Sequence, residues 1–147
     1  MIAARKCILV ATDGSRLAAR AVRTSVEIAH AFGGTLVGIY VIPPSIPPMY
    51  HEGTRYSPQA HQRYIEKLAR KALAPVEAAA RAAGVRCMTR HVSAKQIWRG
   101  ILRAARAHKC DFIVMASRGH WGLEGQIVGS ETMKVLAHSK LPVLVCR

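Results

Sequence analysis

Five short apolar runs alternate with amphipathic stretches along the 147 residues of this chain, and no other feature restricts its fold as strongly. Residues 7–11 are apolar at every position and lead into residues 12–15 (Thr-Asp-Gly-Ser), which predicts a buried strand followed by a turn. From Leu17 the apolar residues recur with a helical period of about 3.6 until Gly33 and Gly34. A buried strand that leads directly into an amphipathic helix is the repeating unit of a parallel sheet.

The same unit recurs to the end of the chain. Further strands are predicted at residues 35–42, 85–92, 111–115 and 141–146, and further helices at 59–83, 94–108 and 130–139. The strand at 85–92 is the least apolar and is expected at an edge of the sheet. Pro75 is expected to bend the second helix, and Ser93 to cap the third at its N-terminus. The pattern predicts one α/β domain over residues 1–147, a parallel sheet with helices on both faces.

Composition excludes several classes of protein. Half of the residues are hydrophobic but only 5% are aromatic, and charged residues interrupt every apolar run well before the ~20 residues of a membrane span. The first residues lack the pattern of a secretory signal peptide, so we expect a cytoplasmic protein. Four widely spaced cysteines, Cys7, Cys87, Cys110 and Cys146, form no metal-ligand pattern and are expected to be reduced thiols.

The chain is strongly basic, with 22 Lys and Arg against 8 Asp and Glu and a net charge of +14. Such a charge attracts polyanions. Much of it lies at helical spacing, as in Arg99, Arg103 and Arg106, and predicts solvated helix faces. No aromatic residues are interleaved with the basic ones as a stacking platform for bases would need, so a nucleic-acid partner is not favoured.

Two loops are candidates for function. Residues 43–58 hold five of the seven prolines, and residues 116–129 are rich in glycine and lead into the helix at 130–139. Ligands of open parallel sheets bind beyond the carboxyl ends of the strands, where both loops begin. A glycine-rich turn before a helix offers backbone N–H groups to phosphate oxygens. No P-loop and no dinucleotide-binding glycine pattern is present, and no catalytic or metal-ligating constellation is predicted.

The glycine-rich loop resembles the nucleotide motif of the universal stress protein (UspA-like) family, G-x2-G-x9-G-[ST]. Gly119 is followed by nine residues and then by Gly129 and Ser130, whereas Ala116 replaces the first glycine of the motif. Residues 8–15, 111–115 and 140–145 are also similar to the family, so the resemblance covers essentially the whole chain. It implies a Rossmann-like (adenine nucleotide alpha-hydrolase-like) five-stranded parallel sheet in the order 3-2-1-4-5. It also implies ATP or another adenine nucleotide as ligand, which Mg²⁺ can accompany.

The resemblance assigns roles to individual residues. Asp13 would lie beside the ribose or the phosphates, and Thr12 and Val41 would border the adenine. Backbone N–H groups of Gly119, Gly129 and Ser130, together with the Ser130 hydroxyl, would hold the phosphates. Five neighbouring residues complete the predicted cofactor-binding set: Met115, Ala116, Arg118, Glu131 and Thr132.

Two charged residues of this set need separate interpretation. Arg118 is suited to screen phosphate charge. Glu131 lies in the first turn of the last helix, where a carboxylate stabilises the helix dipole but opposes a bound phosphate. Its role is therefore either to stabilise the helix or to discriminate between ligands of different charge.

The residues of the last predicted strand indicate that the chain pairs with a second copy of itself. In the order 3-2-1-4-5 it lies at an edge, yet Val143, Leu144 and Val145 are apolar on both of its faces. Antiparallel pairing with the same strand of a second copy would satisfy this edge, and the family resemblance implies the same homodimer.

The function expected from the resemblance is adenine-nucleotide binding in stress response or signalling, with at most slow ATP hydrolysis or autophosphorylation. Three alternatives stay open. The first is a family member that binds no nucleotide and works as a dimeric interaction protein. The second is an enzyme of nucleotide-activated chemistry that uses Asp13 with Mg²⁺. The third is a basic protein associated with nucleic acid.

Overall fold

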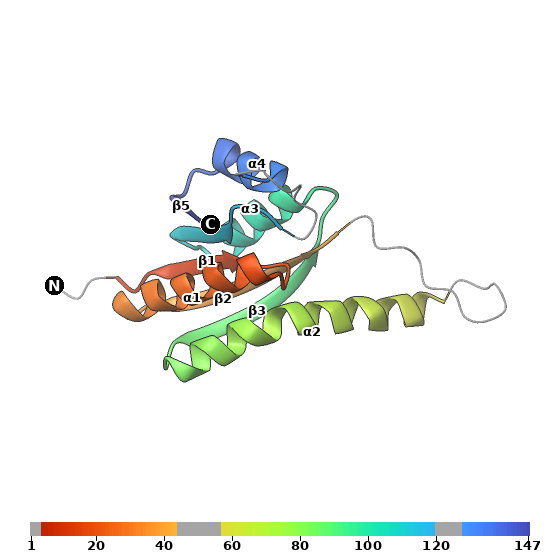
Figure 1. Cartoon of the computed structure of the whole chain (residues 1–147), viewed down its shortest axis with the longest axis horizontal. Coiled ribbons are helices and arrows are strands. Elements are labelled where there is room, and N and C mark those ends of the chain that lie inside the picture. Colours follow the sequence, from red (N-terminus) through yellow and green to blue (C-terminus); the bar gives the residue numbers. More distant parts are fainter. Residues whose placement is uncertain (1–3, 44–56, 120–127) are drawn as a thin grey trace.

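The structure is a computed structural model, and it describes residues 4–43, 57–119 and 128–147. These residues form nine elements in sequence order (Figure 1): β1 (Cys7–Ala11), α1 (Arg16–Ala31), β2 (Thr35–Ile42), α2 (Pro58–Ala82), β3 (Arg86–Ser93), α3 (Ile97–Ala107), β4 (Phe112–Ala116), α4 (Ser130–His138) and β5 (Val143–Cys146). The predicted alternation of strands and helices is confirmed.

The five strands form one parallel sheet in the order β3-β2-β1-β4-β5, as the family resemblance implied. Leu9 of the central strand pairs with Val37 on one side and with Ile113 on the other, and its side chain is fully buried. The least apolar strand, β3, lies at an edge as predicted. Figure 1 shows α2 lying along β3 at the bottom of the view, while α4 and β5 lie on the opposite side of the molecule, at the top.

Side chains that alternate along the strands supply two core layers, because successive residues of a strand point to opposite faces. Ile8 and Val10 of β1 pack under α1 and α2, in a cluster that includes Val22 and Val76. Leu9 packs on the other face, in a cluster with residues of α3 and α4. The sheet is therefore covered by helices on both faces, which is the predicted architecture.

Three helices end in the same way, with a residue in the left-handed region followed by a backbone bond back into the last turn. Two of these residues are glycines, Gly33 after α1 (φ 57°) and Gly84 after α2 (φ 67°). After α3 the position is occupied by Lys109, with φ 52°, and the next N–H, of Cys110, donates to the carbonyl of Ala105 at 2.9 Å. A lysine is strained there because its Cβ crowds the backbone.

We expect Lys109→Gly to stabilise the fold by about 0.5–1 kcal/mol, because relief of this strain exceeds the greater flexibility of glycine in the unfolded chain. Denaturant titration of both proteins measures the change. The converse variant, Gly84→Lys, should lose a similar amount, since its new Cβ would meet nothing within 4 Å and only the backbone conformation is strained. Equal stability of the wild type and Lys109→Gly would contradict the argument.

The predicted cap of the third helix is wrong. Ser93 remains in β3, where it pairs with Ile42, and α3 begins only at Ile97 with Gln96 as its N-cap. Two strand boundaries also differ: Asp111 precedes β4, and β5 begins at Val143. Pro75 lies inside α2, which is helical on both sides of it.

Most of the proline-rich loop predicted at 43–58 lies outside the described residues. Among the helices of the described residues, none has the length and apolar character needed to span a bilayer.

Candidate functional site

The candidate site lies where β1 and β4 end side by side at the centre of the sheet. Ala11 of β1 pairs with Met115 of β4, so the segments that follow them leave the sheet together. From β1 the chain runs into α1 on one face, and from β4 it leads towards α4 on the other. Parallel sheets bind ligands at such a reversal of strand order.

The turn after β1 is held by its own side chains. The Thr12 hydroxyl accepts a hydrogen bond from the Gly14 N–H at 3.1 Å, and Asp13 Oδ1 accepts one from the Ser15 N–H at 2.9 Å. Ser15 in turn caps α1, because its Oγ accepts a hydrogen bond from the Ala18 N–H at 3.2 Å. Gly14 has φ +80°, a conformation that suits glycine. These bonds fix Asp13 at the carboxyl end of the sheet.

The turn after β4 lies against this carboxylate. A Cβ placed on Gly119 would collide with Asp13 Oδ2, so a residue with a side chain cannot occupy this position without moving Asp13. Asp13 and Gly119 are 106 residues apart in sequence and meet here. The structure therefore brings together two of the predicted site residues, Asp13 and Gly119.

The start of α4 is open. Gly129 is its N-cap and has no side chain to cap it, and no side chain of the described residues takes this role. The first N–H groups of a helix have no partner within the helix, and among the described residues no side chain caps those that follow Gly129, which suits them to an anion. Ser130 is exposed at this point. The open helix start is the strongest anion-binding feature of the predicted set.

The structure changes the predicted role of Gly129. Its N–H donates to the carbonyl of Ser117, so it is not free for a phosphate. A Cβ at Gly129 would lie 3.3 Å from Arg118 Cα and 3.4 Å from the Ser117 carbonyl oxygen. Gly129 thus permits close packing of two chain segments, and the N–H groups available to a phosphate belong to the residues after it.

Thr132 and Ala116 hold α4 against the sheet. The Thr132 hydroxyl donates to the Ala116 carbonyl at 2.9 Å, and both residues are buried. The next residue, Ser117, donates its N–H to the Cys146 carbonyl at 2.7 Å. The Thr132 hydroxyl is therefore used within the protein, and this residue positions the helix start.

Glu131 makes a contact that local sequence could not indicate. It lies in the first turn of α4 as predicted, but its Oε2 accepts a hydrogen bond from the Trp98 N–H of α3 at 2.8 Å. Its Oε1 lies 3.7 Å from Lys134 Nζ. Gln96, the N-cap of α3, makes no capping bond with its side chain. Glu131 therefore caps α3 from a different helix, and it couples the open start of α4 to the start of α3.

Val41 and Met115 are buried in the core layer under α3, near the ends of β2 and β4. Val41 packs so closely on α3 that a Cβ at Gly100 would lie 2.9 Å from Val41 Cγ1. These two residues supply an apolar base below the site. Arg118 is partly exposed between Ser117 and Gly119.

Sequence reasoning missed Tyr40. It is 93% buried, and its pKa is raised by burial, then by the negative charge of Asp13 and by Tyr64. The phenol therefore stays protonated at neutral pH, and the charge of Asp13 contributes to the rise of its pKa. The signal that could have found it is its place in β2, one residue before Val41.

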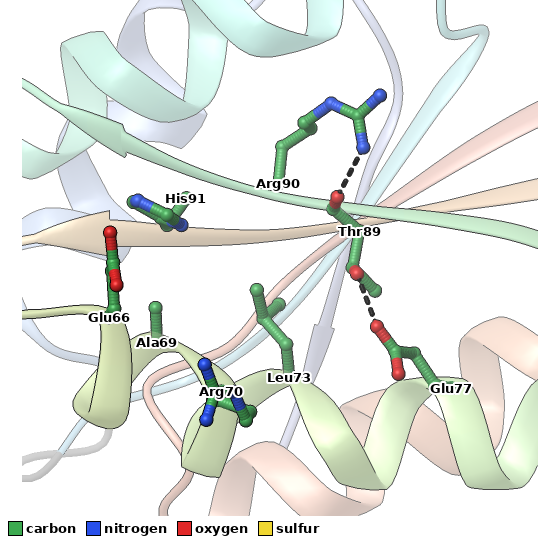
Figure 2. Close-up of a pocket in the computed structure, with 8 residues that line it drawn as sticks. All are labelled: Glu66, Ala69, Arg70, Leu73, Glu77, Thr89, Arg90 and His91. Carbon is green, nitrogen blue, oxygen red and sulfur yellow. Dashed lines mark hydrogen bonds between the residues drawn. The ribbon is translucent and has the colours of Figure 1, made fainter. Parts of the chain in front are cut away.

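A hollow of about 370 Å³ lies elsewhere, between α2 and the edge strand β3 (Figure 2). Its lining mixes acidic with basic residues, and the Thr89 hydroxyl donates to Glu77 Oε1 at 2.5 Å. None of the predicted site residues lines it. Among the described residues, no group of three or more His, Cys, Asp or Glu side chains is placed to hold a metal ion.

Comparison with known proteins identifies the family and the fold. The model of the "Universal stress protein family" matches residues 4–147. A universal stress protein of Thermus aquaticus is 32% identical over 142 residues, which cover 97% of this chain and 98% of that protein. The crystal structure of a universal stress protein family member from Burkholderia pseudomallei is 28% identical and has a TM-score of 0.72, covering 95% of this chain and 94% of that one.

Two further structures share the fold at lower identity. One is a universal stress protein in complex with cAMP, 24% identical with a TM-score of 0.68, which covers 97% of each chain. The other, from Archaeoglobus fulgidus, is in complex with dAMP; it is 17% identical, with a TM-score of 0.70 and full coverage of both chains. With the family match extending over residues 4–147, the chain belongs to the universal stress protein family.

Proposed function

We propose that this protein binds an adenine nucleotide, ATP or a relative of it, at the ends of β1 and β4. The observation that carries the proposal is the start of α4, which has a glycine as N-cap and no capping side chain among the described residues. The Asp13 carboxylate lies beside Gly119 in the neighbouring turn. An anion-binding helix start next to a hydrogen-bond acceptor suits a ligand that carries both phosphate and ribose hydroxyls.

Six of the predicted residues have a direct place in the proposed complex. The phosphates lie on the N–H groups at the start of α4, with the Ser130 hydroxyl as a further donor and Arg118 as a nearby positive charge. Asp13 accepts hydrogen bonds from the ribose. Thr12, Val41 and Met115 border the adenine, which both of the ligands named for the related structures, cAMP and dAMP, contain. Asp13 is a single carboxylate, so Mg²⁺ would be held mainly by the phosphates it accompanies.

We propose that the protein acts in stress response through its nucleotide-bound and nucleotide-free states, with slow turnover at most. Its second partner is a copy of itself. The carbonyls of Pro142 and Cys146 point towards β4, where they accept from Ile113 and Ser117. The two-residue period of a strand therefore directs the backbone groups of Val143 and Val145 outwards, along the free edge of the sheet. Met133 and Leu136, which are 54% and 43% exposed, add apolar surface on neighbouring α4.

Isothermal titration calorimetry with ATP, ADP, AMP and GTP tests the nucleotide proposal. We expect binding of the adenine nucleotides and weaker binding of GTP, because guanine presents a different hydrogen-bonding edge to the residues proposed to border the adenine. Mass detection of small molecules released from denatured protein shows whether a nucleotide is carried through purification. Absence of binding for all three adenine nucleotides would overturn the proposal.

Glu131 provides a test of ligand charge. Glu131→Gln keeps an oxygen that can accept from the Trp98 N–H, so capping of α3 is retained while the negative charge is removed. We expect ATP to bind several-fold more tightly to this variant and AMP to change less, because repulsion grows with the charge of the ligand. Equal changes for ATP and AMP would leave Glu131 with the capping role alone.

A further inference from the structure

Two thiols meet at the end of the sheet opposite the proposed nucleotide site. Cys7 begins β1, and Cys110 lies in the turn between α3 and β4. They are 103 residues apart in sequence, yet their Sγ atoms are 3.2 Å apart, and neither is in a disulfide. A disulfide requires an S–S separation of about 2.05 Å, so the two sulfurs need to approach by only about 1.2 Å.

The backbone around the pair is fixed by two hydrogen bonds. The Cys7 N–H donates to Asp111 Oδ2 at 2.9 Å, and the Asp111 N–H donates to the Cys7 carbonyl at 2.8 Å. Beyond this pair of bonds, Ile8 is in register with Phe112. The proximity of the thiols is therefore a consequence of strand pairing, and it persists for as long as β1 and β4 remain paired.

The two thiols differ in environment. Cys7 is partly exposed, whereas Cys110 is buried. The Cys7 thiol is placed to donate to the His108 carbonyl at 3.8 Å, which leaves the Cys110 thiol as donor in the contact between the two sulfurs. Burial, followed by this hydrogen bond to Cys7, raises the pKa of Cys110. Cys7 is thus the sulfur that a reagent from solvent reaches first.

We infer that Cys7 and Cys110 are a modification site at which hydrogen peroxide forms an intramolecular disulfide. The Cys7 thiolate attacks one peroxide oxygen, so that an S–O bond forms, the O–O bond breaks and the departing oxygen takes a proton to give water. The Cys110 thiol, already in contact with Cys7 Sγ, then attacks it and passes its proton to the departing hydroxyl. The S–S bond forms, the S–O bond breaks and a second water leaves. Two thiols are oxidised by two electrons, and one hydrogen peroxide is reduced to two waters.

The remaining cysteines serve as internal controls. Cys87 and Cys146 are also partly exposed, but no contact between sulfurs involves either of them among the described residues. Burial and the charge of Glu77 raise the pKa of Cys87 to about 11, so little of its reactive thiolate exists near neutral pH. A reagent that merely oxidised accessible cysteines would not select the pair of Cys7 with buried Cys110.

The experiment treats the full chain with one equivalent of hydrogen peroxide, blocks remaining thiols with iodoacetamide and digests with trypsin without reduction. Cleavage after Lys6, Arg16, Lys109 and Arg118 releases Cys7 and Cys110 in peptides 7–16 and 110–118. We expect these two peptides to be joined in monomeric protein, with loss of two thiols out of four, and to separate after dithiothreitol treatment.

Matched variants complete the test. The double variant Cys87→Ser/Cys146→Ser should form the same link, and Cys110→Ala should instead leave a Cys7 sulfenic acid that dimedone traps. Four results would overturn the inference: a link between different cysteines, a disulfide between two chains, stable sulfenic or sulfinic acid in the wild type, or four thiols that survive the peroxide.

Discussion

Replacement of Gly129 by aspartate is expected to weaken ATP binding by at least about 100-fold. The new side chain has little room, since its Cβ would lie 3.3 Å from Arg118 Cα. It also places a negative charge beside the start of α4. At a separation of about 4 Å and an effective dielectric constant of about 20, two like unit charges repel by about 4 kcal/mol, which exceeds the cost of a 100-fold loss. Calorimetric titration of ATP into the folded variant measures the effect.

The matched control is Gly33→Asp. It makes the same exchange of glycine for aspartate at the other end of the sheet, where a Cβ would meet nothing within 4 Å. Aspartate tolerates the left-handed conformation of this position better than most residues. ATP affinity should be unchanged in Gly33→Asp. Undiminished affinity in a folded Gly129→Asp protein would show that the phosphates lie elsewhere.

Val145→Pro is expected to convert a dimer into a monomer. The Val145 N–H points to the free edge of β5, and two-fold symmetry removes this donor from both copies at once. Two lost hydrogen bonds at about 1–1.5 kcal/mol each weaken association by roughly 30- to 150-fold, before any clash of the proline ring is counted. Light scattering over a dilution series measures the dissociation constant.

Two comparisons separate the interface from the fold. Val145→Thr keeps both the branched shape and the N–H, so its dimer should persist. Leu144→Pro removes an N–H that points towards β4, in register with Val114, and should lower thermal stability more than Val145→Pro does. A wild-type protein that is monomeric at micromolar concentration would contradict the dimer altogether.

The repeating strand and helix pattern was sufficient to predict the sheet because each element carries its own periodicity. Ser15 capped α1 as a serine before a helix should, since its hydroxyl and the N–H of Ala18 are close in sequence. Ser93 has the same local signature and does not cap, because pairing of β3 with β2 continues through it. Local propensity was overridden by a long-range pairing that one segment cannot reveal.

In the candidate site, too, some features could be predicted from local sequence and others depend on contacts between distant segments. The motif glycines were readable as a pattern in the sequence, whereas the closeness of Gly119 to Asp13 is visible only in the structure. The bond from Trp98 to Glu131 spans 33 residues and depends on how α3 and α4 pack, so the role of that carboxylate could be narrowed only to two alternatives from sequence. The influence of the Asp13 charge on the pKa of Tyr40 likewise depends on how neighbouring strands pair, which no single periodicity encodes.

The central position of β1 in the sheet has a consequence for folding during synthesis on the ribosome. One edge of β1 finds its partner early, because β2 begins at residue 35, whereas the other edge waits for β4, which begins at residue 112. While residues between these strands are being synthesised, Ile8, Leu9 and Val10 have an unpaired edge on a partly built sheet. Such an edge invites wrong pairing, and pairing between distant segments is slow. The emerging chain should therefore depend on chaperones most before β4 leaves the exit tunnel.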